Sequence, residues 1–249
     1  MIGIDLHVHS NFSDGVDCPE DIVMSAISRG MKVLGFSDHS YTAFDEIPCI
    51  QKDKIKAYKQ EINRLKAKYA DTIEIRCGIE QDYCSVEPTD DYDYVIGSVH
   101  YLYKDGKYLC IDDTSEEFKR ITEEHFGGDV YALTEAYWTC VADVVEKTNA
   151  DIIGHFDLIS KFNENKEFFD EHDKRYVRAW QKAADALLKY DIPFEINTGA
   201  ISRRYKTQPY PSLEMIDYIK SKGGRFVLSG DSHQKEMLCY KFDEYEHLL

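Results

Sequence analysis

The sequence predicts an α/β fold, in which helices cover a sheet of parallel strands. Seven short apolar runs recur along the chain, and each ends in polar residues capable of chemistry. Helical patterns separate most of these runs, as expected for parallel strands, because a parallel neighbour is reached only through a long connection. Six of the nine histidines fall at or just beyond the ends of the runs. In parallel α/β folds those ends meet on one face, where active sites are built.

Each apolar run has the length and composition of a buried strand. In chain order the runs are IGIDLHVH, KVLGFSDH, IEIRCGIEQD, YDYVIGSVH, DIIGHFD, PFEINTG and RFVLSGDSH, which begin at residues 2, 32, 73, 92, 151, 193 and 225. Helical patterns cover residues 19–29, 51–69, 130–147, 173–189 and 212–222. Pro19 and Ser212 mark two helix starts, because proline and serine suit a helix entrance.

One segment, YLYKDGKYLCI at residues 101–111, interrupts the alternation of strand and helix. Tyrosine and apolar residues alternate on both sides of Asp105-Gly106, which is the pattern of a β-hairpin turn. The segment follows the run that ends at His100. The hairpin is therefore predicted either to border the site or to be a surface decoration, and the sequence favours neither.

Composition limits the classes of function. A chain of 249 residues with 43% hydrophobic residues can bury one sizeable core, so residues 1–249 are predicted to form a single domain. The net charge of −16 would repel a polyphosphate backbone, so no nucleic-acid partner is expected. No apolar run approaches about 18 residues and no charged leader is evident, so we expect a cytoplasmic protein without a membrane partner. The seven cysteines lack any C-x-x-C spacing, which argues against disulfides and thiolate zinc sites.

The run ends contain imidazole and carboxylate groups at spacings that suit metal ions. His7 and His9 point to one side of an extended segment, and Asp231 and His233 repeat that spacing. A single such pair is also compatible with hydrogen-bonded core residues, but its recurrence at other run ends favours ligands. The candidate ligands are His7, His9, His39, Glu80, His100, His155, Asp231 and His233. This mixture without thiolate suits zinc, manganese or iron, and it exceeds what one ion can use.

Four other residues are judged by their local surroundings. Asp14 lies in Ser-Asp-Gly, where the local sequence favours a turn residue over a ligand. His125, His172 and His247 lie in polar surroundings and are predicted to be at the surface.

With these motifs the sequence resembles the PHP (polymerase and histidinol phosphatase) superfamily. The four motifs of that superfamily correspond to DLHVHS, SDHS, the pair GSVH and GHFD, and GDSH. The finer pattern of HSNFSDG, CGIEQDY, GSVHYL, IGHFDLI and EINTGA resembles the stand-alone histidinol-phosphate phosphatases over essentially the whole chain. The resemblance implies a distorted (β/α)7 TIM-like barrel with parallel strands and outer helices, which agrees with the seven runs.

The resemblance also implies a centre of two to three divalent transition-metal ions, namely zinc, manganese or iron. By motif position, the first ion would be bound by His7, His9, Glu80 and Asp231, the second by Glu80, His100 and His155, and the third by Asp14, His39 and His233. Asp14 thereby becomes a predicted ligand. Glu80, His100 and Asp231 are the predicted catalytic residues.

The implied reaction is the hydrolysis of L-histidinol phosphate to L-histidinol and phosphate, a step of histidine biosynthesis. The predicted partner is therefore a small phosphate ester, attacked by a metal-bridging hydroxide without a covalent phospho-enzyme. Basic residues follow the fifth and sixth predicted strands, as in related phosphatases. The predicted phosphate-binding residues are Lys161, Arg203 and Arg204.

Two other functions are considered. The first is a PHP-type phosphoesterase that acts on nucleotide 3′-phosphates or nucleic-acid 3′ ends, against which the acidic composition argues. The second is a non-catalytic module that metal ions stabilise, against which the complete set of candidate ligands argues.

Overall fold

The computed structural model describes residues 3–249, and at its centre lies a seven-stranded sheet in the order β1-β2-β3-β4-β7-β8-β9. The strands are β1 (Ile4–Asp5), β2 (Val33–Phe36), β3 (Glu74–Asp82), β4 (Tyr94–Ser98), β7 (Ile152–Ile153), β8 (Phe194–Asn197) and β9 (Phe226–Ser229). Every neighbouring pair is parallel, and each strand lies within one of the predicted runs. Ile2, the first residue of the first run, lies outside the described residues. The predicted parallel α/β architecture is thus confirmed.

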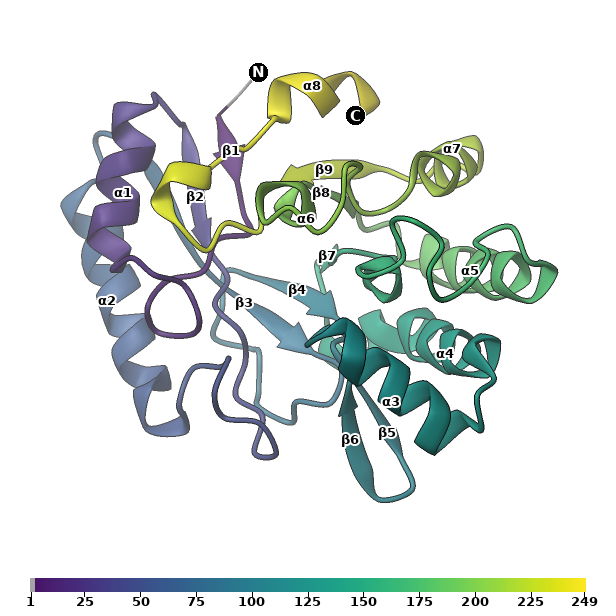
Figure 1. The fold of residues 1–249 in the computed structure, drawn as a ribbon. Helices are drawn as coiled ribbons and strands as arrows, with labels where there is room; N and C mark the ends of the chain where they lie inside the picture. The colour runs from purple at the N-terminus through teal and green to yellow at the C-terminus, as the bar shows by residue number, and fades with distance from the viewer. Residues whose placement is uncertain (1–2) are drawn as a thin grey trace.

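The first and last strands nearly meet, so the sheet forms an almost closed barrel (Figure 1). Beyond the end of β1, Val8 forms an isolated parallel bridge with Ser232, flanked by backbone hydrogen bonds of 2.9 and 3.0 Å. Nearby, the buried carboxylate of Asp5 accepts a hydrogen bond from the backbone N–H of Gly230 at 3.0 Å. We call this junction the seam. It explains why β1 is short: the rest of the predicted run is extended, but it pairs across the seam.

Helices surround the barrel, as predicted (Figure 1). They are α1 (Pro19–Ser28), α2 (Ile55–Lys68), α3 (Ser115–Phe126), α4 (Val130–Thr148), α5 (Lys174–Leu187), α6 (Gly199–Ser202), α7 (Leu213–Ser221) and α8 (Phe242–Tyr245). Short 3₁₀ helices are η1 (Lys52–Lys54), η2 (Leu158–Ser160), η3 (Leu188–Tyr190), η4 (Lys235–Met237) and η5 (Glu246–Leu248). The five predicted helices are confirmed, although their ends differ slightly. The sequence analysis missed α3, which begins at a capping Thr114.

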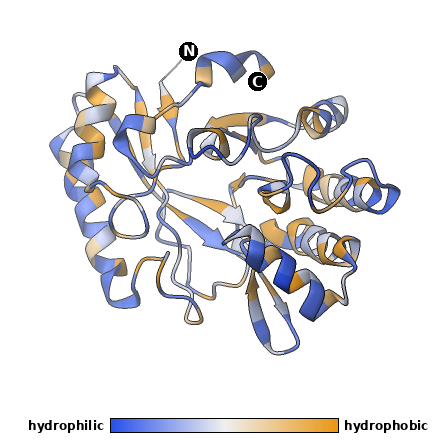
Figure 2. Cartoon of the chain, viewed as in Figure 1, coloured by the Kyte–Doolittle hydropathy of each residue, from blue (hydrophilic) through white to orange (hydrophobic). Residues whose placement is uncertain are grey.

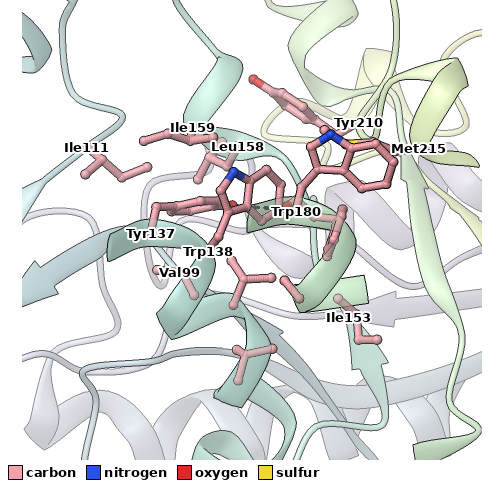
Figure 3. Close-up of a cluster of buried hydrophobic side chains, with 14 of the residues drawn as sticks. Val99, Ile111, Tyr137, Trp138, Ile153, Leu158, Ile159, Trp180, Tyr210 and Met215 are labelled. Carbon is pink, nitrogen blue, oxygen red and sulfur yellow. Dashed lines mark hydrogen bonds between the residues drawn. The ribbon is translucent and has the colours of Figure 1, made fainter. Parts of the chain in front are cut away.

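The hydrophobic core lies between the barrel and the helices. Its largest cluster joins α4 and α5 to the strands, and Figure 3 shows Trp138 and Trp180 within it, near Ile153 and Met215. Leu158 belongs to the same cluster and also faces the cavity described below, so this core supports the segment after β7. The exposed helices α2 and α3 are largely hydrophilic (Figure 2). Within residues 3–249, no helix combines the length and apolar character needed to cross a bilayer.

The predicted hairpin is also confirmed. Strands β5 (Tyr101–Lys104) and β6 (Lys107–Cys110) pair antiparallel, and the turn residues Asp105 and Gly106 both have positive φ, as a two-residue hairpin turn requires. Tyr101 and Cys110, at the base of the hairpin, line the cavity at the ends of the strands. Tyr103, nearer the tip, is 63% exposed. The base of the hairpin therefore borders the site, whereas its tip projects into solvent.

Candidate metal centre

The carboxyl ends of the strands surround a cavity of about 440 Å³. Seven of the predicted ligands line this cavity, namely Asp14, His39, Glu80, His100, His155, Asp231 and His233. The remaining two, His7 and His9, are fully buried and lie within 3.6 Å of the Glu80 carboxylate. The structure thus brings all nine predicted ligands together.

Glu80 lies at the centre of this cluster and is 1% exposed. Five imidazoles surround its carboxylate, those of His7, His9, His39, His100 and His155. Its Oε1 lies 2.8 Å from His155 Nε2 and 3.4 Å from His100 Nε2, whereas its Oε2 lies 3.3 Å from His7 Nε2. We call His7, Glu80, His100 and His155 the floor of the centre.

Three ligands that are more exposed than the floor residues form the other side of the cluster. Asp14 Oδ2 lies 3.0 Å from His233 Nε2 and 3.7 Å from His39 Nε2. The side chain of Asp14 is 33% exposed, compared with 19% for His39 and 14% for His233. We call Asp14, His39 and His233 the rim. The structure places Asp14 among the imidazoles, where the resemblance put it and where the local sequence alone did not.

His9 and Asp231 join floor and rim. The two ring nitrogens of His9 face opposite ways, with Nδ1 3.5 Å from Asp14 Oδ1 and Nε2 3.3 Å from Asp231 Oδ1. Asp231 has a φ of 46°, in the left-handed region that aspartate tolerates better than most residues. A Cβ on Gly199 would lie 2.7 Å from the Cβ of Asp231, so only glycine lets α6 approach this closely. The space around Asp231 thus depends on the glycine in EINTG.

Buried atoms without partners show that cations fit this cluster. In the described chain, no hydrogen bond reaches His7 Nε2, either ring nitrogen of His9, Glu80 Oε2 or His155 Nδ1. Burial of unsatisfied polar groups is costly, so native proteins pair them with protein, water or ions. Three groups bring ligand atoms within 4.8 Å of one another: His9, Asp14, His39 and His233; His7, His9 and Glu80; His39, Glu80 and His100. Such convergent imidazole and carboxylate donors suit borderline divalent ions.

Glu195 supports the floor and was not predicted from sequence. Its buried Oε1 lies 2.7 Å from His7 Nδ1, and its Oε2 accepts a hydrogen bond from the backbone N–H of His155 at 2.9 Å. A carboxylate on one ring nitrogen leaves the other free to bind a metal and fixes the ring orientation. Here Nε2 of His7 is left facing Glu80. The only sequence signal was a carboxylate inside the apolar run PFEINTG.

Asp82 supports His100 in the same way. Its Oδ2 lies 3.1 Å from His100 Nδ1 and accepts the backbone N–H of His100 at 3.0 Å, so Nε2 faces Glu80. Asp82 follows Glu80 by two residues on β3, and the alternation of strand side chains could have suggested that both face the site. Sequence reasoning missed it because only Glu80 of CGIEQDY was assigned a role as a ligand.

Charge coupling across the cluster is strong. Burial alone would lower the pKa of His7, but the carboxylates of Glu195 and Glu80 outweigh it and raise that pKa well above its ordinary value. Burial would raise the pKa of Asp112 on the cavity wall, but the charges of Lys161 and His100 outweigh it, and the pKa is about 2. Asp112 is therefore a carboxylate at neutral pH.

The structure separates the three predicted phosphate-binding residues. Arg203 lines the cavity, with Nη2 3.0 Å from Asp231 Oδ2 and Nη1 3.3 Å from His233 Nε2. Lys161 also lines the cavity, but its ammonium group binds the backbone oxygen and the carboxylate of Asp112. Arg204 does not line the cavity, because it follows α6 in a left-handed turn with a φ of 64°. The prediction for Arg204 is therefore not supported by its position.

The three remaining histidines lie outside the cluster, but one prediction about them is wrong. His172 and His247 are exposed, as predicted. The His125 side chain is only 7% exposed, with Nδ1 3.9 Å from Asp105 Oδ2. The prediction failed because His125 lies on α3, whose amphipathic packing had not been recognised.

Comparison with known proteins gives consistent results. The PHP domain family model matches residues 5–199. A histidinol-phosphatase from Lactococcus lactis is 30% identical, over 94% of this chain and 85% of the relative. A probable histidinol-phosphatase from Schizosaccharomyces pombe is 28% identical, over 86% of this chain and 74% of the relative.

Two solved structures share the fold. One, a putative histidinol phosphatase from Listeria monocytogenes, has a TM-score of 0.81 at 22% identity and covers 97% of this chain and 99% of its own. The other is the Lactococcus lactis histidinol phosphate phosphatase in complex with zinc, L-histidinol and phosphate. It has a TM-score of 0.73 at 24% identity and covers 99% of this chain and 92% of its own. The TIM-like barrel implied by the resemblance is confirmed.

Proposed function

The chain belongs to the PHP domain family, and on that premise we propose that it is a phosphatase that hydrolyses L-histidinol phosphate to L-histidinol and phosphate. The observation that supports this most is the convergence of nine ligand-type residues, several with unpartnered buried atoms, beside a cavity that Arg203 also lines. The reaction would serve histidine biosynthesis. The known relatives named histidinol-phosphatase support the choice of substrate.

Two to three divalent ions would occupy the centre, with zinc, manganese and iron as candidates. The floor, together with His9 and Asp231, offers donors for two ions that share Glu80, and the rim offers donors for a third. When bound, such ions supply Lewis acidity, a water molecule of lowered pKa and neutralisation of phosphoryl charge. The residues around them determine where the substrate lies.

Arg203 is the residue best placed to bind the phosphoryl group. Its guanidinium lies beside Asp231 and His233, so both Nη atoms lie next to the centre, and the side chain is 33% exposed toward the open cavity. A planar guanidinium can donate to two phosphoryl oxygens together. Lys161 offers a single point charge whose ammonium group donates to both the backbone oxygen and the carboxylate of Asp112, whereas only Nη2 of Arg203 contacts a carboxylate, so the contribution of Lys161 to phosphate binding is expected to be smaller.

The rest of the cavity suits the organic part of the substrate. Acidic side chains of Asp45, Asp112 and Asp113 lie on its wall together with Tyr101, and Asp45 Oδ2 accepts a hydrogen bond from the Tyr101 hydroxyl at 2.7 Å. Histidinol phosphate carries an ammonium group and an imidazole, both of which carboxylates can bind. A nucleotide or a nucleic-acid end would bring further negative charge to this wall. The acidic wall therefore disfavours the alternative substrate class.

The test is a phosphate-release screen on metal-replete protein. Histidinol phosphate should be hydrolysed with a much higher kcat/KM than sugar phosphates, aryl phosphates or nucleoside 3′-phosphates. A preference for nucleotides would support the alternative phosphoesterase. Absence of turnover with every substrate, in protein loaded with zinc, manganese or iron, would support the non-catalytic module instead.

A further inference from the structure

A buried carboxylate lies directly behind the rim of the metal centre. Asp38, adjacent to His39, is 0% exposed. Its Oδ1 accepts backbone hydrogen bonds from Ser10 at 2.9 Å and from Ser13 at 3.1 Å. The hydroxyls of the same two serines donate to Oδ1 at 3.0 and 2.7 Å. Within residues 3–249, no basic side chain lies within ion-pair distance of Asp38, so neutral donors from one short segment compensate its charge.

That segment presents a rim ligand. Asp14 directly follows Ser13, and the loop folds back so that the backbone N–H of Gly15 donates to Ser10 O at 3.0 Å. A Cβ on Gly15 would lie 2.4 Å from the backbone oxygen of His9, so the loop packs tightly against the chain leaving β1. Asp14 is the rim ligand on a loop between β1 and α1, whereas His39 and His233 follow strands closely. Its position therefore depends on what holds this loop.

We propose that Asp38 is the positioning residue of the rim: its carboxylate fixes the loop 10–14 and thereby places Asp14 opposite His39 and His233. This inference rests on the proposed function, because it concerns the third of the proposed ion positions. Asp38 also directly precedes the rim ligand His39, and its backbone oxygen accepts a hydrogen bond from the backbone N–H of Glu80 at 3.2 Å.

Asparagine reproduces these contacts only in part. Four donors from Ser10 and Ser13 converge on Oδ1, and the Ser10 hydroxyl also lies 3.0 Å from Oδ2. The amide of asparagine would keep one acceptor oxygen, but it would put an NH₂ group that donates beside the Ser10 hydroxyl and remove the charge that strengthens all four hydrogen bonds, so the loop would be held less firmly. Loss of such outer contacts typically weakens metal binding by about 10-fold to 100-fold. The floor, whose supports are Glu195 and Asp82, should be unaffected.

The experiment compares zinc binding by the wild-type protein and by Asp38→Asn, using equilibrium dialysis with elemental analysis and competition with a chromogenic chelator. One equivalent should bind about 10-fold to 100-fold more weakly in Asp38→Asn, while the other equivalents keep their affinities. Ser13→Ala, which removes the 2.7 Å hydrogen bond and leaves the carboxylate in place, should weaken the same equivalent by a smaller factor. Asp93→Asn is the control, because Asp93 also accepts a backbone N–H, from Cys77, but directly precedes β4, at the end of the strands away from the metal centre.

Two outcomes would overturn the inference and leave the phosphatase proposal standing: unchanged affinity of every equivalent in Asp38→Asn, or equal weakening of all equivalents. If Asp38→Asn does not fold by circular dichroism, Ser13→Ala decides, and unchanged zinc affinity there overturns the inference. In the double variant Asp14→Ala/Asp38→Asn, the zinc affinity should match that of Asp14→Ala alone, because Asp38 acts through Asp14. Failure of the proposed function is seen separately, as absence of histidinol phosphate hydrolysis by wild-type protein.

Discussion

The floor and the rim of the metal centre are built from the same residue types but supported differently. In the floor, Glu80 is 1% exposed and the imidazoles of His7 and His100 are oriented by buried carboxylates. In the rim, Asp14 is 33% exposed and lies on a loop. Ligands that are buried and oriented by a neighbouring carboxylate lose less conformational freedom when they bind an ion, and their burial excludes competing water. The difference indicates that one cluster can combine strongly held ions with an exchangeable one next to the open cavity.

The largest effect should follow from a change in the floor. Glu80→Gln should lower kcat by at least about 1,000-fold, roughly 4 kcal/mol, because a neutral amide cannot compensate the cations that five imidazoles and this carboxylate would hold. Steady-state kinetics and circular dichroism, measured together, test this. Glu87→Gln is a suitable control, because Glu87 pairs with Lys52 away from the cluster. An unchanged kcat in Glu80→Gln would remove Glu80 from the site.

A smaller effect is expected when the support of the floor is removed. Glu195→Gln removes the charge and leaves one acceptor oxygen for two donors, His7 Nδ1 and the backbone N–H of His155, so the orientation of the floor is less firmly held. The most tightly bound metal equivalents should weaken by about 10-fold to 100-fold, and the rim equivalent should not change. Chelator competition measures this. If the weakest equivalent alone responded, the division between floor and rim would be wrong.

The basic side chains that line the cavity should contribute to catalysis without changing the binding of metal ions by the floor or the rim. Arg203→Ala should reduce kcat/KM for histidinol phosphate by about 10-fold to 1,000-fold, roughly 1.4 to 4 kcal/mol of transition-state stabilisation. Lys161→Met should cost less, because the single ammonium group of Lys161 already donates to two oxygens of Asp112. Arg204→Ala, outside the cavity, is the matched control and should behave like the wild type. Equal losses in Arg203→Ala and Arg204→Ala would contradict the assignment, as would a changed metal content.

The smallest effect concerns the rate of metal loss. On brief exposure of metal-replete protein to a chelator, one equivalent should leave first, because the rim ligands are the more exposed ones. The remaining equivalents should leave several-fold more slowly. The order of loss is measured by removing the chelator after successive times and determining the metal that remains bound by elemental analysis. Simultaneous loss of all equivalents would show that floor and rim exchange as one unit.

The sequence was most informative where backbone geometry is simple. The alternation of side chains along a strand placed His7 beside His9, and the structure has their ring centroids 5.1 Å apart. The convergence of parallel strand ends predicted that distant residues such as Glu80 and Asp231 would meet. These inferences required only the positions of apolar runs, which a buried parallel sheet makes conspicuous.

The parts that sequence reasoning missed depend on three-dimensional neighbours. Glu195, Asp82 and Asp38 are carboxylates whose roles follow from the donors that surround them, and no local pattern identifies those donors. The orientation of Arg203 and the departure of Arg204 depend on how α6 ends. The helix α3 was missed because its charged residues obscured its apolar stripe. The wall residue Asp45 belongs to an irregular loop, where no periodicity applies.

The seam also determines when, during synthesis, the site can first exist. His7 and His9 leave the ribosome long before Asp231 and His233, and the paired residues Asp14 and His233 are 219 positions apart in sequence. Contacts between residues so distant in the chain form late, because the intervening loop must be ordered first. A nascent chain that stops short of β9 therefore contains all four floor residues but no barrel closure. Complete metal loading is expected only after β9 has been synthesised, and shortening the chain before β9 should prevent it, because Asp231 and His233 are then missing, while most helices still form.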